Sequence, residues 1–274
     1  MKGQPVVIKI GGSVLDQLHP DFFQECVQLR QKGCHPVVVH GGGPSINRLQ
    51  ERLGMKPVFR EGLRVTDDDD LELVEMVLAG RINKHLVTRL EQVGGEAVGV
   101  SGVDRNLIQV RKKSPALGWV GEVEKVNLSF LQVLIRQGWI PVVASIGVDR
   151  HGQHYNINAD TVAGALAREL KAEKMILVTD VPGIRTDTQK TDTVLSHVSV
   201  AQVENMVKTG AIHGGMVPKV MAAVSGLQAS VQEVVILDGR SPGSLSLYSN
   251  KEGAGTRIGL KEEEGYDTVS YLST

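Results

Sequence analysis

Cysteine and aromatic residues are scarce in this sequence. Only Cys26 and Cys34 occur among 274 residues, and their spacing matches no zinc or redox motif and gives no disulfide framework. Phe, Trp and Tyr together make up 4% of the chain, which counts against the base-stacking surfaces of single-stranded nucleic-acid binders. So few thiols fit a reducing compartment, and we expect a cytoplasmic protein.

An excess of one charge and a long apolar run are also absent. Lys and Arg number 30 against 31 Asp and Glu, which leaves a formal net charge of −1 and no broad basic field for nucleic acid. The first apolar run, PVVIKI, is far shorter than the roughly 20 residues of a membrane-spanning helix, and no signal-peptide pattern precedes it. We therefore expect neither nucleic acid nor a membrane as a partner.

The familiar phosphate-binding and metal-binding motifs are missing. The sequence contains no G-x-x-x-x-G-K-[ST], no G-x-G-x-x-G after a strand, and no protein-kinase motif set. Eight histidines are present, but His151 and His154 flank a short "GQ" hairpin with no acidic or cysteine ligand at suitable spacing. We expect no metal site in the protein itself, and His40 is interpreted as the end of a strand.

Short β-rich runs alternate with helical patterns along most of the chain. This alternation is typical of an α/β fold, with a mostly parallel sheet covered by helices on both faces as a three-layer αβα sandwich. The expected strands are 5–10, 35–40, 97–102, 139–145, 174–180 and 233–238. The expected helices are 20–32, 44–53, 71–93, 127–137, 160–170, 199–208 and 217–230. Such sheets bind ligands beyond the carboxyl ends of their strands.

Two glycine-rich loops follow expected strands. One lies in "VVIKIGGSVL" and the other in "VVVHGGGPSIN", where Pro44 and Ser45 begin a helix. A glycine turn from a strand into a helix exposes backbone N–H groups and points a helix N-terminus at an anion. A tight turn that needs positive φ is the alternative for either loop alone. Three consecutive glycines before a helix start favour the anion site.

Charged and amide side chains accompany these loops. Lys9 is the only charge in "VVIKI", so it either serves an anion at the strand end or lies solvated on an edge strand. In "NINAD", residues 156–160, the side chains of Asn156, Asn158 and Asp160 share one side of an extended segment. Asp160 is expected to be the N-cap of the next helix, which would explain it without any function.

Two later loops complete the pattern. "VTDVPGI", residues 178–184, runs from a strand end into a Pro-Gly turn, and "IHGGMVPKV", residues 212–220, again combines glycines with a lysine, Lys219. We expect the four loops to form one phosphate-binding cleft.

Taken together, the ordered segments resemble the amino acid kinase family, most closely its members that phosphorylate N-acetyl-L-glutamate. The matching segments are "KIGGS" (9–13), "HGGGP" (40–44), "GLRVTD" (62–67), "NINAD" (156–160), "VTDVPGI" (178–184), "GGMVPK" (214–219) and "GTRI" (255–258). The resemblance implies an enzyme of bacterial arginine biosynthesis. It would transfer the γ-phosphoryl group of ATP to the side-chain carboxylate, giving an acyl phosphate, with Mg²⁺ held mainly by the nucleotide phosphates.

The resemblance also implies an organisation in two lobes. Residues 1–172 would form an N-terminal lobe for acetylglutamate binding and dimerisation, 173–260 a C-terminal nucleotide-binding lobe, and 261–274 a polar tail. Arginine-inhibited members carry an additional helix ahead of the first strand. Because the first strand begins near residue 5, the protein is expected to be a homodimer that is insensitive to arginine.

Residue roles follow from the same resemblance. Lys9 would contact the transferred phosphoryl group, Lys219 would stabilise charge on the ADP side, and Asp160 would hold both lysines by ion pairing. Gly12 and Gly42 would offer N–H groups to the γ-phosphate. The acetylated substrate would contact Gly42, Gly43, Arg64, Asn156 and Asn158. The nucleotide would contact Gly11, Asp180, Val181, Pro182, Gly183, Ile184, Arg185, Ile212, His213 and Gly214.

Two features carry open interpretations. Arg105 and Asn106 occupy positions where relatives often have glycines, so the loop there is expected to differ in shape. In residues 70–90, Leu71, Val74 and Val77 belong to an apolar surface that is broader than one buried helix face needs. The family resemblance assigns this surface to a dimer contact, and burial within one chain is the alternative.

Three other functions share parts of this sequence pattern. Another family member, such as an aspartate, glutamate or carrier-bound aminoadipate kinase, would share the lysines and glycines but differ in the acceptor pocket. A ligand sensor without turnover would be expected to lack a charged site residue, whereas Lys9, Asp160 and Lys219 are all present. A nicotinamide-dependent dehydrogenase would need the glycine fingerprint that is missing.

Overall fold

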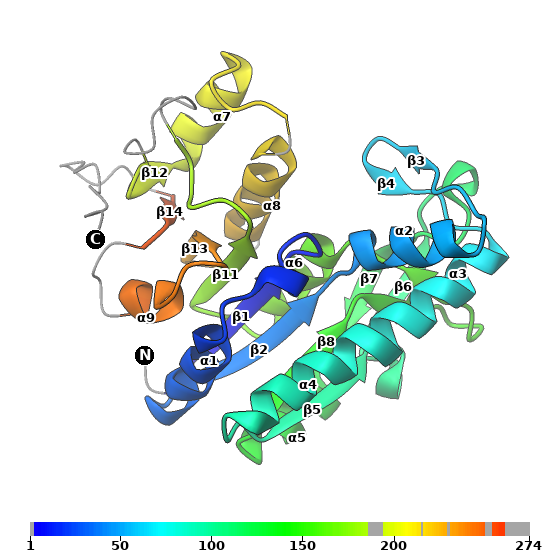
Figure 1. Ribbon diagram of the computed structural model, residues 1–274, viewed down its shortest axis with the longest axis horizontal. Helices are drawn as coiled ribbons and strands as arrows, with labels where there is room; N and C mark the ends of the chain where they lie inside the picture. Colours follow the sequence, from blue (N-terminus) through cyan, green and yellow to red (C-terminus); the bar gives the residue numbers. More distant parts are fainter. Residues whose placement is uncertain (1–2, 186–193, 215, 229–230, 250–253, 261–274) are drawn as a thin grey trace.

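The computed structural model describes residues 3–185, 194–214, 216–228, 231–249 and 254–260. The expected polar tail 261–274 lies outside the described residues. A single large sheet runs through the molecule, and helices cover it on two sides (Figure 1).

The large sheet has eight strands in the order β12-β14-β13-β11-β1-β2-β8-β5. Neighbouring strands run parallel except β13 and β14, which pair antiparallel. The strands are β1 (Pro5–Ile10), β2 (His35–His40), β5 (Ala97–Ser101), β8 (Ile140–Ala144), β11 (Lys174–Thr179), β12 (His197–Ser199), β13 (Glu233–Asp238) and β14 (Thr256–Gly259). All six strands expected from the sequence are confirmed within a residue at each end.

Helices follow most strands, as the alternating pattern predicts. They are α1 (Asp21–Gln31), α2 (Gly43–Arg52), α3 (Asp68–Glu75), α4 (Asn83–Gln92), α5 (Leu128–Arg136), α6 (Ala159–Glu169), α7 (Val200–Lys208), α8 (Met216–Gln228) and α9 (Ser244–Ser249). Figure 1 shows α1 and α4 on the near side of the sheet. Short 3-10 turns lie at Leu15–Gln17, Asp104–Asn106 and Pro115–Leu117.

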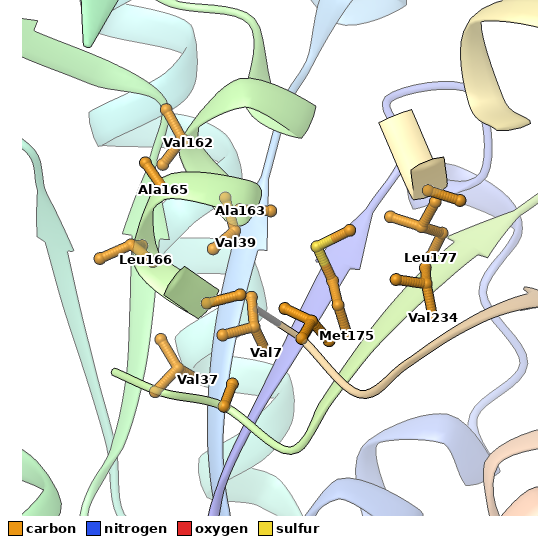
Figure 2. Packing of buried hydrophobic residues seen from close by; sticks show 14 of the residues in the cluster. Val7, Val37, Val39, Val162, Ala163, Ala165, Leu166, Met175, Leu177 and Val234 are labelled. Atoms are coloured by element: carbon orange, nitrogen blue, oxygen red, sulfur yellow. The ribbon is translucent and has the colours of Figure 1, made fainter. Parts of the chain in front are cut away.

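Alternate residues of the central strands feed two separate cores. Val7 of β1 and Val37 of β2 belong to a core with α6 and α8, whereas Ile8 and Val38 belong to a core with α1 and α4. Because successive side chains of a strand point to opposite faces, a strand buried on both faces is apolar along its whole length. The three-layer αβα sandwich is therefore confirmed. Figure 2 shows the first core, with Val7, Val37, Val39, Met175 and Leu177 of the sheet near Val162, Ala163 and Leu166 of α6.

Two small sheets were not expected from the sequence, apart from the "GQ" hairpin. One has four strands in the order β10-β9-β6-β7, and the other is the hairpin β3-β4. Their strands are β3 (Phe59–Arg60), β4 (Leu63–Arg64), β6 (Ile108–Lys112), β7 (Gly121–Val126), β9 (Ile146–Val148) and β10 (His154–Asn156). Most of them are short and partly exposed, so they lack the continuous apolar run that marked the central strands. The "GQ" hairpin is confirmed as the turn between β9 and β10.

The long helix expected over 71–93 contains a change of helix type. Residues Met76–Ile82 form a π-helical segment, η2, between α3 and α4. Leu71, Val74 and Val77 are buried within the chain, whereas the side chain of Met76 is 51% exposed. Burial in one chain therefore accounts for the apolar stripe, and the dimer contact stays a prediction.

The loop at Arg105 and Asn106 has a conformation that suits glycine, and a difference in shape from relatives stays a prediction. The two residues have φ of 55° and 52°, in the left-handed region of the backbone that residues other than glycine rarely adopt. Asn127 donates a hydrogen bond from Nδ2 to the carbonyl oxygen of Arg105 at 3.1 Å, which helps to hold the turn.

A buried pair of polar side chains connects β2 to α4. His40 is fully buried, with Nδ1 3.1 Å from the carbonyl oxygen of Gly41 and Nε2 3.2 Å from Nδ2 of Asn83. A carbonyl only accepts and an amide NH₂ only donates, so His40 carries its proton on Nδ1 and is neutral. Burial lowers the pKa of His40 to about 4.

Asn83 also ties together neighbouring strands of the sheet. Its Nδ2 lies 3.2 Å from the carbonyl oxygen of Val100 on β5 and 2.9 Å from that of Val142 on β8. Its Oδ1 fills the space beside Gly99, where a Cβ would collide with it.

Among the described helices, none is long and apolar enough to cross a bilayer.

We predict that His40 makes the protein less stable in mild acid. The unfolded chain takes up a proton on His40 near the ordinary histidine pKa of about 6.5, whereas the folded protein resists protonation down to about pH 4. The His40 contribution is therefore present above about pH 6.5 and is lost as the pH falls towards 4, by about 3 kcal/mol. Urea unfolding of the wild type and His40→Gln between about pH 4 and 7 measures it.

The variant His85→Gln serves as the control, because His85 is exposed on α4. Subtracting the His40→Gln profile from the wild-type profile should leave a slope over this pH range, and subtracting the His85→Gln profile should leave almost none. Parallel profiles for the wild type and His40→Gln would contradict the prediction.

Candidate active site

The two glycine loops lie against each other at the carboxyl ends of β1 and β2. Ile10 and His40, the last residues of these strands, are paired in register. A Cβ on Gly12 would lie 3.0 Å from the amide nitrogen of Gly43 and 3.0 Å from Cδ of Pro44. At this separation a Cβ would force Gly43 and Pro44 to shift, which favours glycine at position 12.

Gly42 is packed against the π-helical segment η2. It is the N-cap of α2 with extended φ of 178°, and a Cβ there would collide with the side chains of Leu78 and Ile82 in η2. The N-terminus of the ten-residue helix α2 therefore faces the junction of the loops. The N–H groups of such a terminus, together with those of a glycine loop, are suited to hold an anion.

Lys9 is next to this junction. The strand β1 has β11 on one side and β2 on the other, so the edge-strand interpretation of Lys9 is wrong. Its side chain is 12% exposed, and Nζ forms an ion pair with Oδ1 of Asp160 at 2.9 Å. The paired carboxylate lowers the cost of burying the ammonium group at the ligand end of the sheet.

The prediction that Asp160 is a helix N-cap is wrong. The N-cap of α6 is Asn158, whose Oδ1 accepts hydrogen bonds from the N–H groups of Asp160 at 2.8 Å and Thr161 at 3.2 Å. Because Asn158 satisfies these N–H groups, the carboxylate of Asp160 is left to pair with Lys9.

Lys219 pairs with a different carboxylate from the one expected. Its Nζ lies 2.5 Å from Oδ1 of Asp180, just after β11, whereas the ion pair of Asp160 is with Lys9. The expectation that Asp160 pairs with both lysines is therefore wrong for this structure. Burial favours a higher pKa for Asp180, but the hydrogen bond and charge of Lys219 outweigh it, so the pKa of Asp180 is lowered.

A pocket of about 160 Å³ opens beside the glycine junction. Its lining includes all five residues expected to contact the acetylated substrate, namely Gly42, Gly43, Arg64, Asn156 and Asn158. The hairpin β3-β4 contributes Phe59 and Leu63, and the ring of Phe59 lies 4.9 Å from Cζ of Arg64. The pocket thus combines one cation and two amides with apolar walls. We call it the acceptor pocket.

A second pocket, of about 380 Å³, lies in the part of the chain after β11. Its lining includes eight of the residues expected at the nucleotide, namely Asp180, Val181, Pro182, Gly183, Ile184, Arg185, Ile212 and His213. Gly11 and Gly214 are not among its lining residues. We call it the nucleotide pocket.

Arg240 also lines the nucleotide pocket and was not expected there from the sequence. It follows β13 and is held by Asp238 through hydrogen bonds of 2.9 Å from Nε and 2.8 Å from Nη2. A basic residue just beyond a strand end, in "LDGR", is the signal that could have identified it.

A third hollow, of about 510 Å³, is larger than these two pockets and is lined mainly by residues of α6, β7 and α8. It shares Asn158 with the acceptor pocket and also contains Asp160. The acceptor pocket and this hollow thus meet at the N-terminus of α6.

Comparison with known proteins identifies the class. Residues 4–238 match the profile described as the Amino acid kinase family, and the chain belongs to this family. It is 44% identical to an acetylglutamate kinase of Heliobacterium modesticaldum, over 93% of this chain and 92% of that protein. It is 45% identical to an acetylglutamate kinase of a Synechococcus species, over 96% of this chain and 90% of that protein.

Solved structures show the same fold. The smu.665 protein of Streptococcus mutans UA159 superposes with a TM-score of 0.82 at 32% identity, covering 94% of this chain and 99% of that one. Carbamate kinase from Giardia lamblia bound to AMP-PNP superposes with a TM-score of 0.67 at 18% identity, covering 94% of this chain and 99% of that one. The expectation of an amino acid kinase fold is confirmed.

We predict that Asn158 contributes to stability through its cap. Asn158→Ala should lower the free energy of unfolding by about 1 kcal/mol, because two N–H groups of α6 lose their acceptor. Asn158→Asp keeps an acceptor oxygen at the same place and should stay close to the wild type. Urea denaturation of the three proteins measures the difference, and an equal loss in both variants would argue against the capping role.

Proposed function

We propose that the protein transfers the γ-phosphoryl group of ATP to the side-chain carboxylate of N-acetyl-L-glutamate, in arginine biosynthesis. One observation carries the proposal: the ion-paired Lys9 and the junction of the glycine loops adjoin a pocket that holds Arg64 and two amides. The identity to proteins named acetylglutamate kinase over most of their length supports the choice of acceptor.

The chemistry asks for alignment and for neutralisation of charge. A carboxylate nucleophile is already ionised at neutral pH, so no general base is needed. The charge to be stabilised is spread over the oxygens of the transferred phosphoryl group. Backbone N–H groups at Gly12 and Gly42 and the ammonium of Lys9 are suited to this, because they are fixed before the reaction.

Asp160 is proposed to act through Lys9 by holding its ammonium group at the strand end. Lys219 is proposed to stabilise charge on the ADP side. Its ion pair with Asp180, which lines the nucleotide pocket, supports a position of Lys219 near the nucleotide. Mg²⁺ would add a further positive charge to the phosphates. Within the described ranges no group of three or more His, Cys, Asp and Glu could hold a metal ion, so nucleotide oxygens and water would be its main ligands.

Arg64 is proposed to bind the carboxylate that is not phosphorylated. An arginine paired with the attacking carboxylate would withdraw charge from it and weaken it as a nucleophile, so the reacting group has to lie away from Arg64. The apolar walls formed by Phe59, Leu63 and Leu78 would then receive the acetyl and methylene groups. Homodimer formation, cytoplasmic location, insensitivity to arginine and the two-lobe division at residues 172 and 173 stay predictions.

The proposal is tested by trapping the acyl phosphate with hydroxylamine. The purified protein should turn over ATP with N-acetyl-L-glutamate and far more slowly with glutamate or aspartate. Lys219→Ala should lower kcat by about 100-fold or more, because charge on the leaving phosphate loses its cation. Lys208→Ala, an exposed lysine at the end of α7, is the matched control and should keep wild-type turnover.

Each alternative has its own outcome in this assay. Turnover with glutamate, aspartate or a carrier-bound acceptor instead would support a kinase activity but contradict N-acetyl-L-glutamate as its acceptor. Nucleotide binding without turnover of any acceptor would favour a sensor over an enzyme.

A further inference from the structure

The guanidinium of Arg64 is surrounded by neutral oxygen atoms. Arg64 is only 6% exposed, and burial lowers its pKa. Its Nη1 donates to Oε1 of Gln50, and its Nη2 donates to Oδ1 of Asn47 and to the carbonyl oxygen of Gly43. Across the described part of the chain, the ion pairs within 4.0 Å include none with Arg64. A buried cation in such surroundings keeps its charge available for an anion.

Gln50 is the residue that connects Arg64 to a carboxylate without contact between the two charges. It is fully buried in the last turn of α2, and its Nε2 donates to Oδ1 of Asp70 in α3. A carboxylate accepts only, so Asp70 receives the NH₂ end of the amide and turns the oxygen end towards Arg64. Asp70 is itself fixed, since its N–H donates to the N-cap Asp67 at 2.9 Å.

The chemical identity of this amide matters for the charge of the pocket. An ionised glutamate at position 50 would place a carboxylate on Nη1 and form a charge-assisted pair with Arg64. It would also face Asp70 without the N–H groups that glutamine donates to it. The substrate's carboxylate would then compete with an internal partner of the same kind. A glutamine fixes the same nitrogen with a neutral oxygen and leaves the positive charge for the ligand.

We propose that Gln50 is a positioning residue, whose amide holds the Arg64 guanidinium beside the acceptor pocket and separates it from Asp70. This inference rests on the proposed function, because it needs the α-carboxylate of the acceptor as the ligand of Arg64. Gln50 does not touch the substrate and acts only through Arg64.

The experiment compares two acceptors in five proteins. N-acetyl-L-glutamate carries the α-carboxylate, and 4-acetamidobutyrate is the same molecule without it. Both are assayed by hydroxylamine trapping at saturating ATP with the wild type, Gln50→Glu, Gln50→Met, Arg64→Lys and Gln132→Glu. Gln132→Glu makes the same change at an exposed helical position in α5 and is the matched control.

In Gln50→Glu the KM for N-acetyl-L-glutamate should rise by about 10-fold or more, while kcat and the KM for ATP change little, because one charge-assisted contact is lost. The preference for N-acetyl-L-glutamate over 4-acetamidobutyrate in kcat/KM should shrink by a similar factor, approaching that of Arg64→Lys. Gln50→Met removes the acceptor but adds no charge, so it should shift the same values less. Gln132→Glu should match the wild type.

Loss of activity by equal factors for both acceptors would mean a general structural defect and would overturn the role of Gln50. Unchanged KM and preference in both Gln50 variants would also overturn it, and if Gln50→Glu does not fold, Gln50→Met decides alone. A wild type that turns over neither acceptor would instead overturn the proposed function, and the inference with it.

Discussion

Gly12 lies so close to the backbone of Gly43 and Pro44 that the ends of β1 and β2 meet without a side chain between them. This contact fixes where α2 begins, and thereby where the N–H groups of its first turn point. It depends on the parallel pairing of the two strands, which brings their carboxyl ends to one edge of the sheet. Lys9 and the acceptor pocket both lie beside this junction.

The cations of the site are held in two different ways. Lys9 and Lys219 each have a carboxylate partner, Asp160 and Asp180 respectively, whereas Arg64 has neutral oxygens. A lysine ammonium is a compact and strongly hydrated charge, so its burial is costly without a counter-charge. The arginine fork spreads its charge over a plane and can be held by neutral acceptors. The difference suits the roles proposed above, in which Lys9 and Lys219 act on a phosphoryl group and Arg64 recognises a carboxylate.

Sequence reasoning reached the central sheet because buried parallel strands are apolar throughout and leave a clear pattern. It also found the loops, since consecutive glycines after a strand cost backbone entropy and are kept where the main chain has to approach another group closely. It failed where two nearby side chains could both form the same hydrogen bond or ion pair, and only the fold decides between them. Asn158 and Asp160 are both good N-caps, and only the fold shows that Asn158 caps α6 while Asp160 turns to Lys9.

Gln50 could not have been identified from the sequence. A glutamine inside a helix such as "GPSINRLQER" is ordinary, and its neighbours Arg64 and Asp70 come from other elements. The partner of Lys219 was missed for a related reason. Asp160 and Asp180 both follow strands of the site, and the spacing of residues along the chain does not say which of them lies nearer to a given lysine.

The side chain of Asn83 and the missing side chain of Gly99 occupy one space. A substitution at position 99 that adds a Cβ is therefore admissible only once position 83 has become smaller, and shrinking position 83 first removes hydrogen bonds to β5 and β8. The two positions can change only in one order and through a less stable intermediate. Over evolutionary time a side chain at position 99 is therefore expected only together with a smaller residue at position 83.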